Sequence, residues 1–132
     1  MIVCGYGAVG EKVVDILMQH DIKVIVVEMD KKKVDLRRDR CVTVIQGNAT
    51  SSKVLKIAGV ERARAIAITM DDDAKNLFTV ITAKSLNSKI VIATRANEDL
   101  FKEKLGEAGA RFIAAPNKSA GDELFKELTK GI

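Results

Sequence analysis

The stretch Gly5-Tyr6-Gly7-Ala8-Val9-Gly10 directly follows the short apolar run Ile2-Val3-Cys4 and opens an amphipathic segment. Its glycines have the GxGxxG spacing, in which each glycine has a mechanical role. The first permits a tight turn, the second lets backbone N–H groups approach a pyrophosphate, and the third lets the helix pack closely on the strand. The positive end of that helix also attracts an anion. The stretch therefore predicts a phosphate-binding turn between a first strand and a first helix.

Outward from this turn, short β-branched runs alternate with amphipathic stretches along the whole chain. The pattern predicts strands at residues 2–4, 23–28, 42–45, 64–69, 89–94 and 111–114. It predicts helices at residues 8–20, 31–39, 51–58, 72–87, 97–108 and 118–130. Capping residues stand at several helix starts, namely Ser51 or Ser52, Asp71 or Asp72, Asn97 and Asn117. Because the loops are short, parallel strands joined by right-handed crossovers are expected. The sequence therefore predicts an α/β fold with a Rossmann-like, doubly wound parallel six-stranded sheet in the order 3-2-1-4-5-6.

Length and composition limit the class of protein. The 132 residues suffice for about one domain, and with 47% hydrophobic residues and a net charge of +4 the chain is neither disordered nor strongly basic. No apolar run approaches the roughly 18 residues that span a bilayer, and no signal-peptide pattern is present, so we expect a soluble, cytosolic domain. Two cysteines and one histidine are too few for a disulfide framework or a zinc site. In the predicted strand order Cys4 and Cys41 lie about 9–10 Å apart or more, so both thiols are expected to be reduced packing residues.

Glu28 ends the second predicted strand, 18 positions after Gly10. A carboxylate at this place accepts hydrogen bonds from both hydroxyls of an adenosine ribose and repels a 2′-phosphate, which favours NAD(H) or an adenine nucleotide over NADP. The neighbouring Lys31, Lys32 and Lys33 act in the opposite sense, because they attract additional phosphate. The alternative interpretation of Glu28 is a solvated acid at the end of a strand.

The ends of the other predicted strands converge on the same crevice, where open α/β sheets bind ligands. The stretches that follow or end these strands are Gly47-Asn48-Ala49-Thr50, Thr69-Met70-Asp71-Asp72-Asp73 and Thr94-Arg95. We expect Thr69, Asp71 and Asn76 to reach the ligand. The alternative role for the three consecutive acids is to cap a helix and complement its dipole. A metal site is not predicted, because consecutive acids do not converge without partners from elsewhere.

Together these stretches resemble the RCK domain, also called the KTN or TrkA-N domain. The similarity runs through nearly the whole chain. Besides the glycine stretch, it covers Val26-Val27-Glu28-Met29-Asp30, Gly47-Asn48-Ala49-Thr50, residues 54–65, Asp72-Asp73-Ala74-Lys75-Asn76, Ala93-Thr94-Arg95-Ala96, Ala108-Gly109-Ala110 and Pro116. Residues 47–65 are the most specific part, because ordinary dehydrogenases have no counterpart to them.

The resemblance implies a cytoplasmic regulatory domain of a potassium channel or potassium-uptake system, held at the inner face of the cell membrane by the pore. Residues 1–116 would form the nucleotide-binding lobe and residues 117–132 a crossover helix for dimerisation. Such domains form homodimers and rings beneath the pore, and a ligand shifts the ring between two shapes. The apolar helix at 72–87 also predicts a homodimer or larger assembly. The crossover helix would carry Leu124, Phe125, Leu128 and Ile132 on one face, and the alternative is a helix that closes its own sheet.

The glycine turn, the strand ends and the resemblance together predict the residues that bind NAD(H) or an adenine nucleotide (ATP, ADP or AMP). They are Gly5, Tyr6, Gly7, Ala8, Val9, Gly10, Glu28, Met29, Asp30, Asn48, Ala49, Thr50, Thr69, Asp71, Asn76 and Arg95. The chain departs from the family pattern at Ala8, where many relatives carry Arg beside the phosphates, and at Asn48, where they carry Asp. Residues 94–97 lack the paired glutamates of calcium-gated members, so calcium gating through them is not expected.

Two other classes of function are alternatives. A stand-alone NAD-dependent oxidoreductase needs a proton-transfer group at the crevice, but Tyr6 has no Lys four positions later and His20 lies near the end of the first predicted helix, so no catalysis is expected. Basic residues within 31–40 suggest nucleic-acid binding, but acids dilute them and no aromatic residues are interleaved for base stacking. We expect the chain to be a piece of a larger channel, with its membrane connection upstream of Met1, rather than a separate small subunit.

Overall fold

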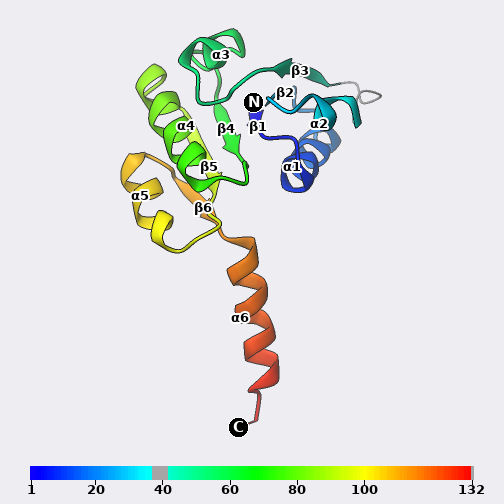
Figure 1. The fold of residues 1–132 in the computed structure, drawn as a ribbon, viewed down its shortest axis with the longest axis vertical. Helices are drawn as coiled ribbons and strands as arrows, with labels where there is room; N and C mark the ends of the chain where they lie inside the picture. The colour runs from blue at the N-terminus through cyan, green and yellow to red at the C-terminus, as the bar shows by residue number, and fades with distance from the viewer. Residues whose placement is uncertain (37–41, 132) are drawn as a thin grey trace.

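Six parallel strands form the centre of the structure, a computed structural model that describes residues 1–36 and 42–131 (Figure 1). The strands are β1 (Ile2–Cys4), β2 (Ile25–Glu28), β3 (Thr43–Gln46), β4 (Ala65–Ile68), β5 (Val91–Arg95) and β6 (Phe112–Ala114). They lie in the order β3-β2-β1-β4-β5-β6, and all neighbours are parallel. In the central strand, Val3 is level with Val26 of β2 and with Ala67 of β4. The predicted fold class and strand order are confirmed.

Helices alternate with these strands along the described residues. They are α1 (Ala8–Gln19), α2 (Lys31–Leu36), α3 (Ser52–Ile57), α4 (Asp73–Leu86), α5 (Leu100–Ala108) and α6 (Pro116–Leu128). In Figure 1, α1 and α2 lie on one side of the sheet and α3, α4 and α5 on the other. The predicted bounds agree with these to within about three residues. Residues 37–39 of the helix predicted at 31–39, together with Cys41 and Ile132, lie outside the described residues.

The side chains of successive strand residues point to opposite faces, which divides the core in two. On one face, Val3 and Val26 pack with Val14 of α1. On the other face, the alternate positions of the same strands pack beneath α3, α4 and α5 in a cluster that includes Ile2, Cys4, Val27, Leu55, Val80 and Leu105. Burial raises the pKa of the Cys4 thiol to about 12, so this thiol is protonated at neutral pH and serves as a packing residue.

Of the four predicted helix caps, two agree with the structure and two do not. The Ser51 hydroxyl accepts from the Val54 N–H at 3.4 Å, and the Asp72 carboxylate accepts from the Lys75 N–H at 3.1 Å, as expected. The prediction that Asn97 caps a helix is wrong, because α5 begins at Leu100 with Asp99 at the N-cap. The prediction for Asn117 is also wrong. Helix α6 begins two residues earlier than predicted, at Pro116 with Ala115 at the N-cap, and the fixed φ and missing N–H of proline suit the first helical position.

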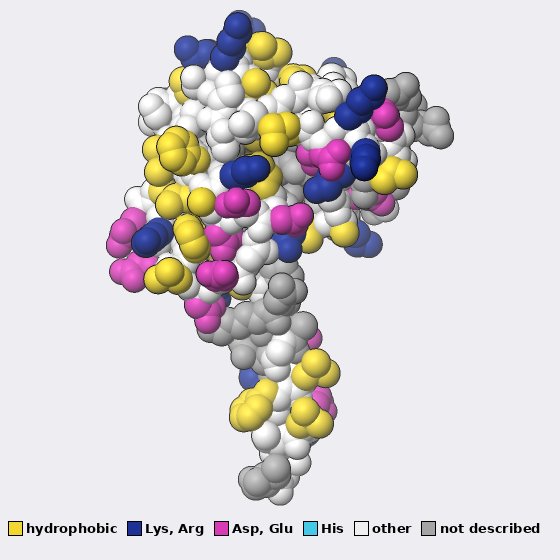
Figure 2. All heavy atoms as spheres, viewed as in Figure 1, with side chains coloured by type: hydrophobic (Ala, Val, Ile, Leu, Met, Phe, Trp, Pro, Cys, Tyr) yellow, Lys and Arg dark blue, Asp and Glu magenta, His cyan; other side chains and the backbone are white. Residues whose placement is uncertain are grey.

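Helix α6 leaves the sheet and projects away from the rest of the molecule (Figure 1). Its side chains Leu124, Phe125 and Leu128 are 65%, 65% and 79% exposed. Figure 2 shows these apolar side chains along the projecting part of the helix. The alternative expectation, a last helix that closes its own sheet, therefore does not describe this structure.

Candidate functional site

The glycine turn after β1 has the tight packing that its spacing predicts. Gly5 has a φ of +97°, a conformation that side chains rarely adopt. A Cβ at Gly10 would lie 1.9 Å from the Gly5 carbonyl oxygen, so only glycine lets α1 approach β1 this closely. Gly7 is different, because a Cβ there would meet only the Lys33 Nζ, at 3.9 Å. Gly7 is the N-cap of α1 and makes no side-chain capping hydrogen bond, so the helix presents its backbone N–H groups to the space beside Gly7.

A cavity of about 330 Å³ lies beside this turn, at the carboxyl ends of β1 to β4. Its volume is in the range of small-molecule sites, and its place is the switch point of the strand order, where α/β sheets bind ligands. The residues that line it are Gly5, Gly7, Val27, Glu28, Met29, Asp30, Lys33, Gly47, Asn48, Ala49, Thr69, Met70, Asp71, Asp72 and Lys75.

The cavity brings together nine of the residues predicted from the sequence. These are Gly5, Gly7, Glu28, Met29, Asp30, Asn48, Ala49, Thr69 and Asp71. The other seven predicted residues, which do not line it, are Tyr6, Ala8, Val9, Gly10, Thr50, Asn76 and Arg95. Several of these seven support the residues that do line the cavity.

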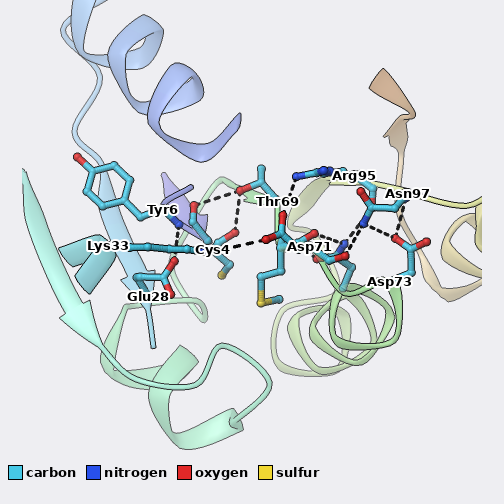
Figure 3. Close-up of polar contacts among 12 residues, drawn as sticks. Cys4, Tyr6, Glu28, Lys33, Thr69, Asp71, Asp73, Arg95 and Asn97 are labelled. Carbon is cyan, nitrogen blue, oxygen red and sulfur yellow. Dashed lines mark hydrogen bonds and ion pairs between the residues drawn. The ribbon is translucent and has the colours of Figure 1, made fainter. Parts of the chain in front are cut away.

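Tyr6 contributes its backbone and not its ring. The ring is fully buried and packs with Val3 and Val14 in the core beneath α1, whereas the Tyr6 N–H donates to Glu28. Figure 3 shows the ring pointing away from Glu28 and Lys33. Tyr6 therefore shapes the turn from behind, and its ring does not enter the cavity.

Asn76 and Thr50 hold the loops that border the cavity. The fully buried Asn76 side chain accepts from the Met70 N–H at 3.0 Å and donates to the carbonyls of Met70 and Arg95, which ties the end of β4 to the end of β5. The Thr50 hydroxyl donates to Asn48 Oδ1 at 2.7 Å, and this closes the loop after β3. Both residues fix the cavity walls without lining them.

Glu28 lies at the floor of the site with 8% of its surface exposed. Its Oε1 accepts from the Tyr6 N–H and its Oε2 from the Asp30 N–H, each at 2.8 Å. The carboxylate therefore joins the glycine turn to the end of β2. A carboxylate has about four acceptor sites, so these two hydrogen bonds leave each oxygen able to accept another donor.

The three consecutive acids after β4 have three separate roles. Asp72 caps α4, as the alternative interpretation expects. Asp73 is buried and accepts from the Asn97 N–H at 2.7 Å and the Glu98 N–H at 2.8 Å, so it fixes the turn before α5. Asp71 pairs with the Arg95 guanidinium at 3.2 Å and with Lys33 Nζ at 3.8 Å. Over the described residues, no cluster of three or more His, Cys, Asp or Glu is arranged to hold a metal ion.

Two lysines that the predicted site does not contain line the cavity. Lys33 comes from α2 and Lys75 from the first turn of α4. They face four carboxylates of the lining, those of Glu28, Asp30, Asp71 and Asp72. The sequence shows three consecutive lysines near Glu28, but the rotation of α2 about its axis determines that only Lys33 points toward the cavity. Lys31 and Lys32 are exposed, whereas Lys33 is half-buried.

Comparisons with known proteins agree with this geometry. The family model of the TrkA-N domain matches residues 1–116. Potassium channel protein 1 of Methanocaldococcus jannaschii is 32% identical over 127 residues, which cover 95% of this chain and 38% of that protein. The chain spans between 20% and 38% of the length of the first three curated relatives that it matches.

Two solved structures extend the comparison. The crystal structure of the TrkA-N domain of inner membrane protein ybaL from Escherichia coli has a TM-score of 0.88 at 27% identity, over 98% of this chain and 95% of that one. The crystal structure of GsuK bound to ADP has a TM-score of 0.85 at 27% identity, over 97% of this chain and 33% of that one.

The parallel sheet of this order, with a glycine turn and a cavity at its switch point, defines the class of Rossmann-like domains. Within this class, the chain belongs to the TrkA-N domain family, and the resemblance seen in the sequence is confirmed. No helix among the residues that the structure describes is long and apolar enough to cross a membrane.

Proposed function

We propose that this chain is a nucleotide-sensing regulatory domain that controls potassium transport through a membrane channel or transporter. The observation that carries this proposal is the cavity between Gly7 and Glu28, where an open helix N-terminus and a buried carboxylate face the same space. The name of the potassium channel relative and the ADP bound to GsuK support it.

The ligand is an adenine nucleotide, either ADP, ATP or AMP, or NAD(H). Its phosphate would accept hydrogen bonds from the first N–H groups of α1, where the helix dipole favours an anion. The ribose hydroxyls would donate to the remaining acceptor sites of Glu28. A 2′-phosphate at that place would meet a carboxylate, so NADP binds less well than NAD(H).

The regulatory step is a shift of population between two assemblies. A nucleotide biases the pore only to the extent that its affinity differs between two arrangements of the domain. The arrangement would be a homodimer or a larger ring, joined through the projecting helix α6. The exposed side chains of α6 and those of Phe78 and Ile81 on α4, which are 64% and 50% exposed, are the surfaces available for such contacts.

The domain would sense the nucleotide without converting it. None of the described residues that line the cavity is a His, Cys or Tyr, the residue types that most often move a proton in nicotinamide chemistry. The alternative, an oxidoreductase, is tested directly by incubating the protein with NADH and candidate substrates. Steady oxidation of NADH that depends on Tyr6 or His20 would support the alternative.

Calorimetric titration with ADP, ATP, AMP, NAD⁺ and NADH tests the proposed function. We expect Glu28→Ala to weaken binding by about tenfold or more, because hydrogen bonds to a charged group contribute about 1.5–3 kcal/mol. Gly7→Asp should abolish binding, because it places a carboxylate where the phosphate would lie. The matched control is Glu61→Ala, which removes an exposed acid outside the cavity.

Circular dichroism of each variant separates a lost ligand from a lost fold. The Glu28 variant needs this check, because it also leaves the N–H groups of Tyr6 and Asp30 without an acceptor. The site assignment fails if the wild-type chain binds none of the five nucleotides, or if both folded variants bind with unchanged affinity.

A further inference from the structure

The ammonium group of Lys33 lies at a position that is electrostatically unfavourable for a cation. Its Nζ lies 3.9 Å from where a Cβ on Gly7 would be, directly beside the N-terminus of α1. The N-terminus of a helix carries about half a positive charge, so a cation beside it is disfavoured. A negatively charged group beside Lys33 offsets this repulsion.

One acid that pairs with Lys33 is Asp71, which reaches it from the opposite side of the cavity. Lys33 comes from α2, which follows β2, whereas Asp71 follows β4. Figure 3 shows the lysine side chain extended across the site toward Asp71, with Glu28 nearby. The pair is long, at 3.8 Å, and the Asp71 side chain is 78% exposed. An ion pair of this kind contributes little free energy, so it exchanges easily.

Asp71 has a second cationic partner that does not depend on Lys33. The Arg95 guanidinium donates to Asp71 Oδ1 at 3.2 Å, and its side chain is 18% exposed. Lys33 can therefore leave Asp71 without leaving that carboxylate unpaired. The loop after β4 also keeps its other hydrogen bonds, in which the Met70 N–H donates to Asn76 and the Asn97 amide donates to the Asp71 carbonyl.

We propose that Lys33 is a phosphate ligand of the nucleotide site, and that Asp71 is the counter-ion which the phosphate displaces. This inference rests on the proposed function and names the residue that selects for phosphorylated ligands. A phosphate oxygen beside Gly7 accepts from both the α1 N–H groups and the Lys33 ammonium. The anion thus turns a repulsion between two positive groups into two charge-assisted attractions.

The ligand class follows from this exchange. Nucleotides with one or more phosphates bind more tightly than adenosine, which cannot replace Asp71 as the partner of Lys33. Ala8 provides no polar side chain at the start of α1, so the cation for the phosphate comes from α2 instead. Asp71 lowers the affinity, because the phosphate has to compete with it.

Titration of the 132-residue chain with ADP and with adenosine tests the role of Lys33. We expect Lys33→Ala to weaken ADP binding by about tenfold and to leave adenosine binding within about twofold. Lys33→Arg should restore most of the ADP affinity. The matched control is Lys32→Ala, which removes the same charge from the same helix but from an exposed position, and it should change ADP binding by less than about twofold.

Asp71→Asn tests the competition. We expect ADP to bind up to about fivefold more tightly to this variant, because the phosphate no longer competes with a carboxylate for Lys33. The inference is overturned if Lys33→Ala and Lys32→Ala weaken ADP equally, or if Asp71→Asn weakens ADP as much as Lys33→Ala does. Those results leave the proposed function intact, whereas a wild-type chain that binds none of the five nucleotides contradicts the proposed function itself.

Discussion

Glu28 shows how one carboxylate can shape a site and still be available to a ligand. Each of its oxygens accepts one backbone N–H, from Tyr6 and from Asp30, and so the glycine turn and the end of β2 are held together by the same side chain. The group is nearly buried, which makes these hydrogen bonds stronger than they would be in water. In the proposed function, a ribose at this place would meet a carboxylate that is already oriented, so that little ordering would be required on binding.

Gly10 is the residue at which a single methyl group should be least tolerated. A Cβ at this position would lie 1.9 Å from the Gly5 carbonyl oxygen, so α1 has to move away from β1. We expect Gly10→Ala to lower the free energy of unfolding by about 2 kcal/mol or more. Urea denaturation followed by circular dichroism measures this change.

The control for that experiment is Gly121→Ala in α6. A Cβ at Gly121 has no atom within 4 Å, and the helix interior favours alanine by about 1 kcal/mol. This variant should be as stable as the wild-type chain or slightly more stable. If both alanine variants unfold at the same urea concentration, the close packing of α1 on β1 is not what requires glycine at position 10.

At the scale of elements, the consecutive acids Asp72 and Asp73 at the start of α4 make different connections. Asp72 caps its own helix, whereas the neighbouring Asp73 reaches the turn before α5. The capping hydrogen bond of Asp72 is local and exposed. The hydrogen bond from the Asn97 N–H to Asp73 is partly buried and joins residues 24 positions apart in the chain. The two acids should therefore differ in their contribution to stability.

We expect Asp73→Ala to lower the free energy of unfolding by about 2–3 kcal/mol, because it leaves the partly buried N–H groups of Asn97 and Glu98 without their acceptor. Asp72→Ala removes one exposed cap and should cost about 1 kcal/mol. Thermal and urea unfolding of the two variants provide the comparison. A larger loss for Asp72→Ala than for Asp73→Ala would contradict these roles.

Elements defined by a repeating pattern were predictable from the sequence, and positions set by contacts between elements were not. Alternating β-branched runs and the glycine turn predict the sheet and its order, because parallel strands allow few arrangements. Asn97 resembles a cap, but Asp73 binds it and delays the start of α5. The sequence places three lysines after Glu28, but only the structure shows that Lys33 lies beside Gly7. Similarly, Tyr6 follows the first glycine of the turn, yet its ring belongs to the core.

On the scale of the whole molecule, the apolar side chains divide between a buried core and a projecting helix. Leu124, Phe125 and Leu128 are each at least 65% exposed, whereas buried apolar clusters fill both faces of the sheet. Exposed apolar side chains grouped on one helix mark a surface that another chain covers.

We expect the chain to form a dimer in which α6 is part of the contact. The double variant Leu124→Glu with Leu128→Glu should be monomeric in sedimentation equilibrium, because two carboxylates would have to be buried at the interface. Its thermal unfolding should remain cooperative. A second double variant, Phe78→Glu with Ile81→Glu, tests the exposed surface of α4 separately. Dissociation of this second variant alone would place the contact on α4 and contradict a contact through α6.

Helix α6 projects from the rest of the domain, so a small rotation of its base moves its far end over a larger distance. Its 13 residues correspond to a length of about 20 Å, at about 1.5 Å per residue. A rotation of about 10° at its base therefore moves its far end by about 3 Å. The base follows β6, and β6 is hydrogen-bonded to β5, whose last residue Arg95 holds Asp71 at the cavity mouth. Any rotation of the base would therefore displace the tip farther than the base itself, and a neighbouring subunit in contact with the tip would be displaced with it.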